Sequence, residues 1–224
     1  MSLGDRLADE ARRDAARAWL QSEGGPCHVK LCGMFRDEDI AAVNAILPDM
    51  VGFVTGFAKS HRNVEPPQLK RLSALVDERI YRVAVSVNAP FSRVGHNGTC
   101  NVDIVQLHGD EDELYLQGVR SRTNAGIIQA FRIRERADVE RALRSSADMI
   151  LLDAGQGSGQ QFDWELVEGI DRPFILAGGL TPENVGEAIA ALHPWGVDLS
   201  SGIETERVKD PQKMAAAVAA VRRA

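Results

Sequence analysis

The amino-acid sequence predicts an α/β protein built as a single (β/α)8 TIM barrel with an extra N-terminal helix. Eight short apolar runs alternate with helical patterns along the chain. The runs are nearly continuously hydrophobic, as parallel strands buried on both faces must be. The chain length of 224 residues suits one such barrel. An open doubly wound sheet would alternate in the same way, but the first run lacks the glycine-rich dinucleotide turn of that fold.

The first 26 residues stand outside this alternation. Within residues 3–21, apolar side chains fall near one face and charged side chains elsewhere, which predicts a helix that ends at Gly24, Gly25 and Pro26. We therefore expect a helical extension over residues 1–26 and a catalytic barrel over residues 27–224. The helix would cover the bottom of the barrel, mediate a dimer, or be partly an expression artefact.

Eight strands are predicted where the apolar runs occur, and each gives way to polar or glycine-containing sequence. They are residues 28–32, 50–54, 81–87, 104–107, 126–131, 148–152, 174–177 and 197–199. The run at 81–87 is especially rich in β-branched residues, which favour strands.

Helices are predicted between these strands, and crossovers of that length impose parallel neighbours. They are residues 37–47, 67–77, 111–118, 134–145, a short helix from 163, 182–192 and 211–222. Residues 90–101 contain Gly95, Asn97 and Gly98, so any helix there is weak.

Composition indicates which binding partners and which cellular location to expect. The net charge is −6 and the basic residues are scattered, which argues against nucleic-acid binding but leaves room for a local basic pocket. The sequence contains no run of about 18 apolar residues, so no membrane span is predicted. Cys27, Cys32 and Cys100 form an odd, irregularly spaced set, which is a poor disulfide framework. A reducing, cytoplasmic location is therefore expected.

Polar residues after the strands of such a barrel face its active-site mouth. The candidates are Cys32, the 59–62 loop, Asn88, His108, Arg132, Asp153, Gly178-Gly179 and Ser200-Ser201-Gly202. The last two loops follow strands seven and eight, the customary phosphate site of this architecture. Their backbone N–H groups can converge on a phosphate, although such glycines can also serve only to make tight turns.

Two candidates suit acid–base chemistry. Cys32 ends the first strand and is either a small buried hydrophobe or a reactive thiol, whose pKa would have to be lowered by a cation or a helix N-terminus. Asp153 ends the sixth strand, and the flexible sequence after it weakens the alternative that it caps a helix. Asp198, within the eighth strand, is expected to be partly structural and to orient the phosphate turn.

Two further candidates suit binding. Arg62 is either a solvated loop charge or a bidentate clamp for a carboxylate, a geometry that lysine provides less well. His108 can act as a ligand or an acid, but such a histidine more often orients its neighbours. No His, Asp or Glu cluster has the spacing of a metal site.

The strand-end segments together resemble the phosphoribosylanthranilate isomerase family of tryptophan biosynthesis. Eight segments match in the family's order over about residues 28–222: Lys30-Leu-Cys-Gly33, Val51-Gly-Phe-Val54, Lys59-Ser-His-Arg62, Val105-Gln-Leu-His-Gly109, Leu151-Leu-Asp153, Gly157-Ser-Gly159 with Phe162-Asp-Trp164, Ala177-Gly-Gly-Leu-Thr-Pro-Glu-Asn184 and Val197-Asp-Leu-Ser-Ser-Gly-Ile-Glu204. Each segment is weak alone, and their order makes the signal strong.

The resemblance implies a cofactor-free Amadori rearrangement of N-(5′-phosphoribosyl)anthranilate, a phosphorylated sugar. It implies that Asp153 is the acid, Cys32 the base, and Arg62 the holder of the anthranilate carboxylate. Gly178, Gly179, Ser201 and Gly202 match the phosphate loops, and His108 lies in a matched segment. A monomer and a homodimer are equally compatible with the sequence.

Two other hypotheses compete with this one. A sister sugar-phosphate isomerase, of the histidine pathway or with dual substrates, would resemble this chain in fold but usually pairs two aspartates, which Cys32 disfavours. A catalytically silent phosphate-binding barrel is disfavoured because Cys32, Asp153 and Arg62 occur together.

Overall fold

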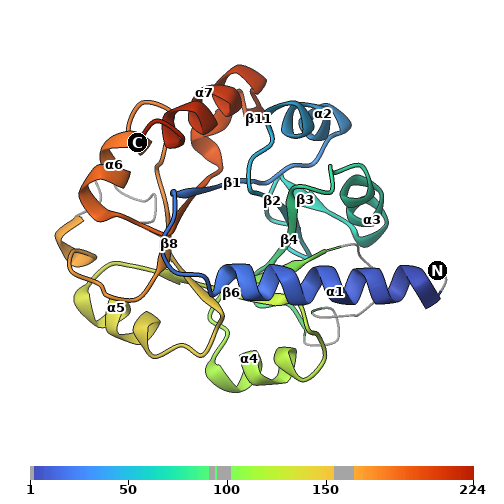
Figure 1. Ribbon diagram of the computed structural model, residues 1–224, viewed down its shortest axis with the longest axis horizontal. Helices are drawn as coiled ribbons and strands as arrows, with labels where there is room; N and C mark the ends of the chain where they lie inside the picture. Colours follow the sequence, from blue (N-terminus) through green and yellow to red (C-terminus); the bar gives the residue numbers. More distant parts are fainter. Residues whose placement is uncertain (1–2, 91–93, 95–101, 154–163) are drawn as a thin grey trace.

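The computed structural model describes residues 3–90, 94, 102–153 and 164–224 of the chain. Within them, eight parallel strands close into a barrel, because β1 (His28–Cys32) pairs with both β2 (Met50–Thr55) and β9 (Gly196–Leu199). The other barrel strands are β4 (Tyr81–Ser86), β5 (Ile104–Leu107), β6 (Gly126–Arg132), β7 (Met149–Asp153) and β8 (Phe174–Ala177). This closure confirms the predicted barrel and excludes the open sheet (Figure 1).

A ring of helices surrounds the strands (Figure 1). They are α2 (Asp37–Ile46), α3 (Pro66–Ala74), α4 (Glu113–Arg120), α5 (Arg136–Leu143), α6 (Val185–Leu192) and α7 (Pro211–Val221). The short helix expected from 163 is a single 3-10 turn, η2 (Trp164–Leu166), in the part described. Most of the weak segment at 90–101 lies outside the described residues.

Three very short strands and a second 3-10 turn were not predicted. The two-residue strand β3 (Asn63–Val64) adds to β2. After β9 comes η3 (Ser201–Ile203), and then β10 (Glu204–Thr205) pairs antiparallel with β11 (Val208–Lys209). Two-residue strands carry too little sequence for a period-2 pattern to appear, which is why they escaped prediction.

Side chains on each strand alternate between two packed layers. On β7, Leu151 belongs to the cluster inside the barrel, whereas Ile150 and Leu152 pack toward the helices. On β1, Cys32 faces the interior, and Leu31 belongs to the outer layer. The same alternation therefore sends the last residue of each of these strands toward the mouth of the barrel.

Helix α1 (Leu3–Leu20) lies across the opposite end of the barrel (Figure 1). Leu20 belongs to the interior cluster, and a Cβ on Gly126 would stand 2.7 Å from its Cδ1, so glycine there lets the helix approach the start of β6. Arg12 and Arg17 pair with the buried carboxylates of Asp103 and Asp148 at 2.8 and 3.0 Å. Helix α1 thus covers the barrel bottom, the first of the three roles considered for it.

The helices in the described parts of the chain include none that is both long and apolar enough to cross a membrane.

Candidate active site

The predicted site residues lie at or after the carboxyl ends of the barrel strands. Cys32 ends β1 and Asp153 ends β7. His108 follows β5, and the two glycine-containing loops follow β8 and β9. Arg62 comes from the loop between β2 and β3, and its Cδ occupies the space that a Cβ on Gly33 would need. Side chains distant in sequence therefore converge because parallel strands end on one side of the barrel.

Asp153 is held by a short chain of hydrogen bonds on the β5 side. Gln106 Nε2 lies 2.9 Å from His108 Nδ1, and His108 Nε2 lies 3.2 Å from Asp153 Oδ2. With the Gln106 amide in this orientation, its N–H donates to Nδ1, which corresponds to the tautomer with the ring hydrogen on Nε2. In that tautomer His108 Nε2–H donates to Asp153 Oδ2. This agrees with the expectation that His108 orients a neighbour.

A cavity of about 670 Å³ opens beside this pair. His108 and Asp153 both line it, together with Arg132 and Gln129. The side chains of His108 and Asp153 are 31% and 21% exposed, so both are reached by solvent. Asp153 can therefore exchange protons with bulk water between turnovers.

Cys32 lies in much drier surroundings. The residue is 7% exposed, and Lys30, two positions earlier on the same strand, is fully buried. Lys30 Nζ forms an ion pair of 2.8 Å with Asp198 Oδ2. Burial raises the pKa of the Cys32 thiol, and the charges of Lys30 and Lys209 oppose that rise. Asp198 thus bonds to a lysine inside the barrel, a structural contact, and its expected part in orienting the phosphate turn stays a prediction.

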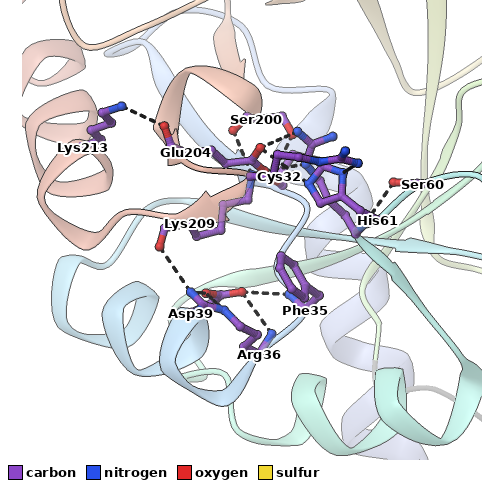
Figure 2. A network of polar contacts seen from close by, with 12 residues as sticks. Cys32, Phe35, Arg36, Asp39, Ser60, His61, Ser200, Glu204, Lys209 and Lys213 are labelled. Carbon is purple, nitrogen blue, oxygen red and sulfur yellow. Dashed lines mark hydrogen bonds and ion pairs between the residues drawn. The ribbon is translucent and has the colours of Figure 1, made fainter.

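Arg62 is anchored by Glu204, a residue that sequence reasoning did not single out. Its Nε and one terminal nitrogen bond the two carboxylate oxygens of Glu204 at 2.6 and 2.7 Å. Lys209 Nζ adds a third contact of 2.8 Å. Burial would raise the pKa of Glu204, but the two cations lower it to about 2. Figure 2 shows Glu204 and Lys209 beside Cys32, Ser200 and His61.

The loops after β8 and β9 pack directly on each other. Gly178 and Gly179 have φ angles of 94° and 66°, which favour glycine. A Cβ on Gly202 would collide with the carbonyl of Leu180, so the second loop rests on the first. Asn184 fixes the first loop, because its side-chain amide donates to the carbonyl of Gly179. The loop that contains Gly202 and the loop that begins with Gly178 and Gly179 therefore lie against each other.

Several residues of this site were missed from sequence. Lys30 stands in an apolar run and Lys209 in a polar stretch, and neither pattern reveals that both ammonium groups are buried. Glu204 closed a matched segment, which was the available signal for it. The motif residues at 157–163 lie outside the described residues. The described chain contains no cluster of three His, Cys, Asp or Glu side chains able to hold a metal ion.

Comparisons with known proteins give a consistent result. A family model described as N-(5′phosphoribosyl)anthranilate (PRA) isomerase matches residues 29–220. An N-(5′-phosphoribosyl)anthranilate isomerase of Thermoanaerobacter sp. (strain X514) is 40% identical over 202 residues, which cover 87% of this chain and 97% of that protein.

Solved structures agree with the sequence comparisons. Phosphoribosyl anthranilate isomerase from Thermotoga maritima matches with a TM-score of 0.80 and 32% identity, over 88% of this chain and 100% of that one. A second structure of such an isomerase, in complex with reduced 1-(o-carboxyphenylamino)-1-deoxyribulose 5-phosphate, matches with a TM-score of 0.78 and 31% identity, over the same shares.

Proposed function

This chain belongs to the N-(5′-phosphoribosyl)anthranilate isomerase family, and from that premise we propose that Asp153 and Cys32 are the acid and the base of its reaction. The chain is an isomerase of tryptophan biosynthesis. Its reaction is the Amadori rearrangement of phosphoribosylanthranilate to 1-(o-carboxyphenylamino)-1-deoxyribulose 5-phosphate.

Asp153 starts the proposed mechanism as a general acid. It donates its proton to the ribose ring oxygen, the bond between that oxygen and C1 breaks, and the substrate nitrogen forms an iminium at C1. The carboxylate that remains accepts the hydrogen bond of His108 Nε2, 3.2 Å away. Solvent in the open cavity then returns a proton to Asp153, which must be protonated again before the next turnover.

Cys32 completes the proposed mechanism as a general base. Its thiolate takes the proton from C2, the electron pair forms the C1–C2 double bond, and the iminium nitrogen accepts the displaced pair. The resulting enolamine tautomerises to the ketone. The substrate's own nitrogen thus serves as the electron sink, and the sequence implies no cofactor. Cys32 and Asp153 come from β1 and β7, which β8 and β9 separate, so the two groups can approach the sugar from different sides.

Binding is proposed to use the other strand-end groups. One edge of the Arg62 guanidinium donates two hydrogen bonds to Glu204. We assign the remaining N–H donors, of the five that an arginine carries, to the anthranilate carboxylate. The surface of Gly178, Gly179, Ser201 and Gly202 is assigned to the phosphate. We further propose that residues 1–26 extend a catalytic barrel at 27–224 and that the protein works in the cytoplasm.

The observation that carries this assignment is the placement of one thiol and one carboxylate at the same barrel mouth. Replacing either group tests it directly. We expect Cys32→Ala and Asp153→Asn each to lower kcat by about 10²-fold or more. The assay follows the loss of phosphoribosylanthranilate fluorescence, and circular dichroism checks the fold. Turnover near that of the wild type in a folded variant would remove the assigned role.

The same assay separates the sister hypotheses. Offering the histidine-pathway aminoaldose as a second substrate should give no turnover, because that reaction usually uses two aspartates. Conversion of both substrates at similar kcat/KM would instead assign the chain dual specificity. If the protein consumes neither substrate, the result would favour the silent phosphate-binding barrel.

A further inference from the structure

We propose that Lys30 is a positioning residue of the reaction: it is the counter-ion that stabilises the Cys32 thiolate, and Asp198 holds its ammonium group in place. The proposal deepens the function above and rests on Cys32 being the base. It assigns a catalytic purpose to a buried ion pair that the acid–base scheme leaves unused.

The register of three strands brings these groups together. Lys30 and Cys32 are two residues apart on β1, so both side chains face the barrel interior. Asp198 is the β9 partner of Lys30, and Gly52 is the β2 partner of Cys32. The pairing therefore fixes the ammonium, the carboxylate and the thiol on rigid strands instead of mobile loops.

Gly52 lies directly against both the thiol of Cys32 and the ammonium of Lys30. A Cβ built on Gly52 would stand 2.7 Å from Cys32 Sγ and 3.1 Å from Lys30 Nζ. The sulfur and the nitrogen therefore share the space that a side chain at position 52 would fill. Glycine at that position leaves room for the contact, because every larger residue would push Sγ and Nζ away.

Lys30 carries its charge inside the barrel. Burial alone would lower its pKa, but the charges of Asp198 and Cys32 reverse that effect and the pKa of Lys30 is raised. An ammonium offers three donors, and Asp198 Oδ2 takes one at 2.8 Å. A thiolate formed beside it gains an opposite charge that water does not screen, so the contact favours the charged form of Cys32.

The other charged groups around the thiol play lesser parts. Lys209 also lowers the pKa of Cys32, but its ammonium bonds Glu204 and the carbonyl of Ser200, both at 2.8 Å. Asp198 raises the thiol pKa. A buried ion pair could instead serve the fold alone, and in that case its removal would change stability without moving the ionisation of the thiol.

The test measures that ionisation without substrate. Thiolate ultraviolet absorbance is recorded against pH for the full chain, and the curve of the matching Cys32→Ser variant is subtracted to isolate Cys32. We expect Lys30→Met to raise the midpoint by about one pH unit or more. Asp198→Asn should lower it, because the thiolate is then the remaining counter-ion of Lys30. Lys70→Met, which removes an exposed lysine on α3, is the matched control and should leave the midpoint unchanged.

Kinetics complete the test. We expect Lys30→Met to lower kcat by about tenfold or more with KM little changed, because Lys30 acts through Cys32 and not on the substrate. A folded Lys30→Met with the wild-type midpoint would overturn the proposal. If that single variant does not fold, Asp198→Asn gives the deciding measurement, because it keeps Lys30 and removes only the competing carboxylate; a midpoint equal to that of the wild type there would also overturn the proposal.

The two proposals fail in different ways. Full turnover by Cys32→Ala would remove the base assignment, whereas the absorbance curves would still report whether Lys30 controls the thiol. A shifted midpoint with unchanged kcat in Lys30→Met would overturn the catalytic purpose claimed for the pair.

Discussion

The two groups proposed as the acid and the base stand at the ends of two strands of this barrel but in opposite surroundings. Asp153 is 21% exposed on its side chain and borders a cavity of about 670 Å³. Cys32 is 7% exposed and lies beside the fully buried Lys30. The acid side is therefore open to solvent and includes a hydrogen bond between His108 and Asp153, whereas the base side is dry and contains paired charges.

The difference between the two surroundings fits the role proposed for each group. An acid that donates a proton in every turnover needs a route for its return, which an open cavity provides. A thiol that acts as a base needs its charged form stabilised, and cations do this most strongly where water is excluded. Consequently, substitutions on the base side should cost stability as well as turnover, and substitutions on the acid side should cost turnover alone.

Glu204 offers the largest expected effect. Its side chain is 7% exposed and forms ion pairs with both Arg62 and Lys209. Glu204→Gln leaves those cations without their carboxylate, so we expect it to lower the free energy of unfolding by about 3 kcal/mol. Asp153→Asn should change it by less than about 0.5 kcal/mol. Urea unfolding measures both, and equal losses in the two variants would erase the distinction between the two sides.

The same residue predicts how stability depends on pH. The folded-state pKa of Glu204 is about 2, below its ordinary value of 4.5. Because the pKa is lower in the folded state, ionised Glu204 stabilises the fold above pH 4.5. That contribution is lost as the pH falls from 4.5 toward 2. The gap corresponds to about 3 kcal/mol at most. Subtracting the unfolding curve of Glu204→Gln from that of the wild type isolates this share, and a pH-independent difference would show that Glu204 is not the group titrating.

The acid side was easier to predict from sequence than the base side. Asp153 and His108 follow apolar runs, and the ends of buried strands locate the mouth of a barrel. The ion pair of Lys30 and Asp198 joins residues 168 positions apart. Periodicity reveals which residues share a strand face, but it does not reveal which distant strand supplies the counter-charge.

Arg62 illustrates the same limit. Its type and place suggested a carboxylate clamp, yet Glu204, 142 positions later, takes two of its donors. The pairing depends on the hairpin of β10 and β11, whose two-residue strands have no detectable sequence period. Local sequence thus identified the cation, and only the closed barrel identified its partner.

Gln106 gives the smallest expected effect and the finest test of the acid side. It is fully buried, and its Nε2 lies 2.9 Å from His108 Nδ1. Gln106→Leu removes that donor, so the ring hydrogen is no longer confined to Nε2, the nitrogen that faces Asp153. One lost hydrogen bond is worth about 1 kcal/mol, which corresponds to about a fivefold fall in kcat.

Nitrogen NMR of the His108 ring measures the underlying change directly. In the wild type we expect the hydrogen on Nε2, and in Gln106→Leu a mixture of both ring forms. The free energy of unfolding should change by less than about 1.5 kcal/mol, because the substitution removes one hydrogen bond and no charge. A variant that keeps the Nε2 form and full kcat would show that Asp153 alone orients His108, since Asp153 would then be the partner that selects the ring form.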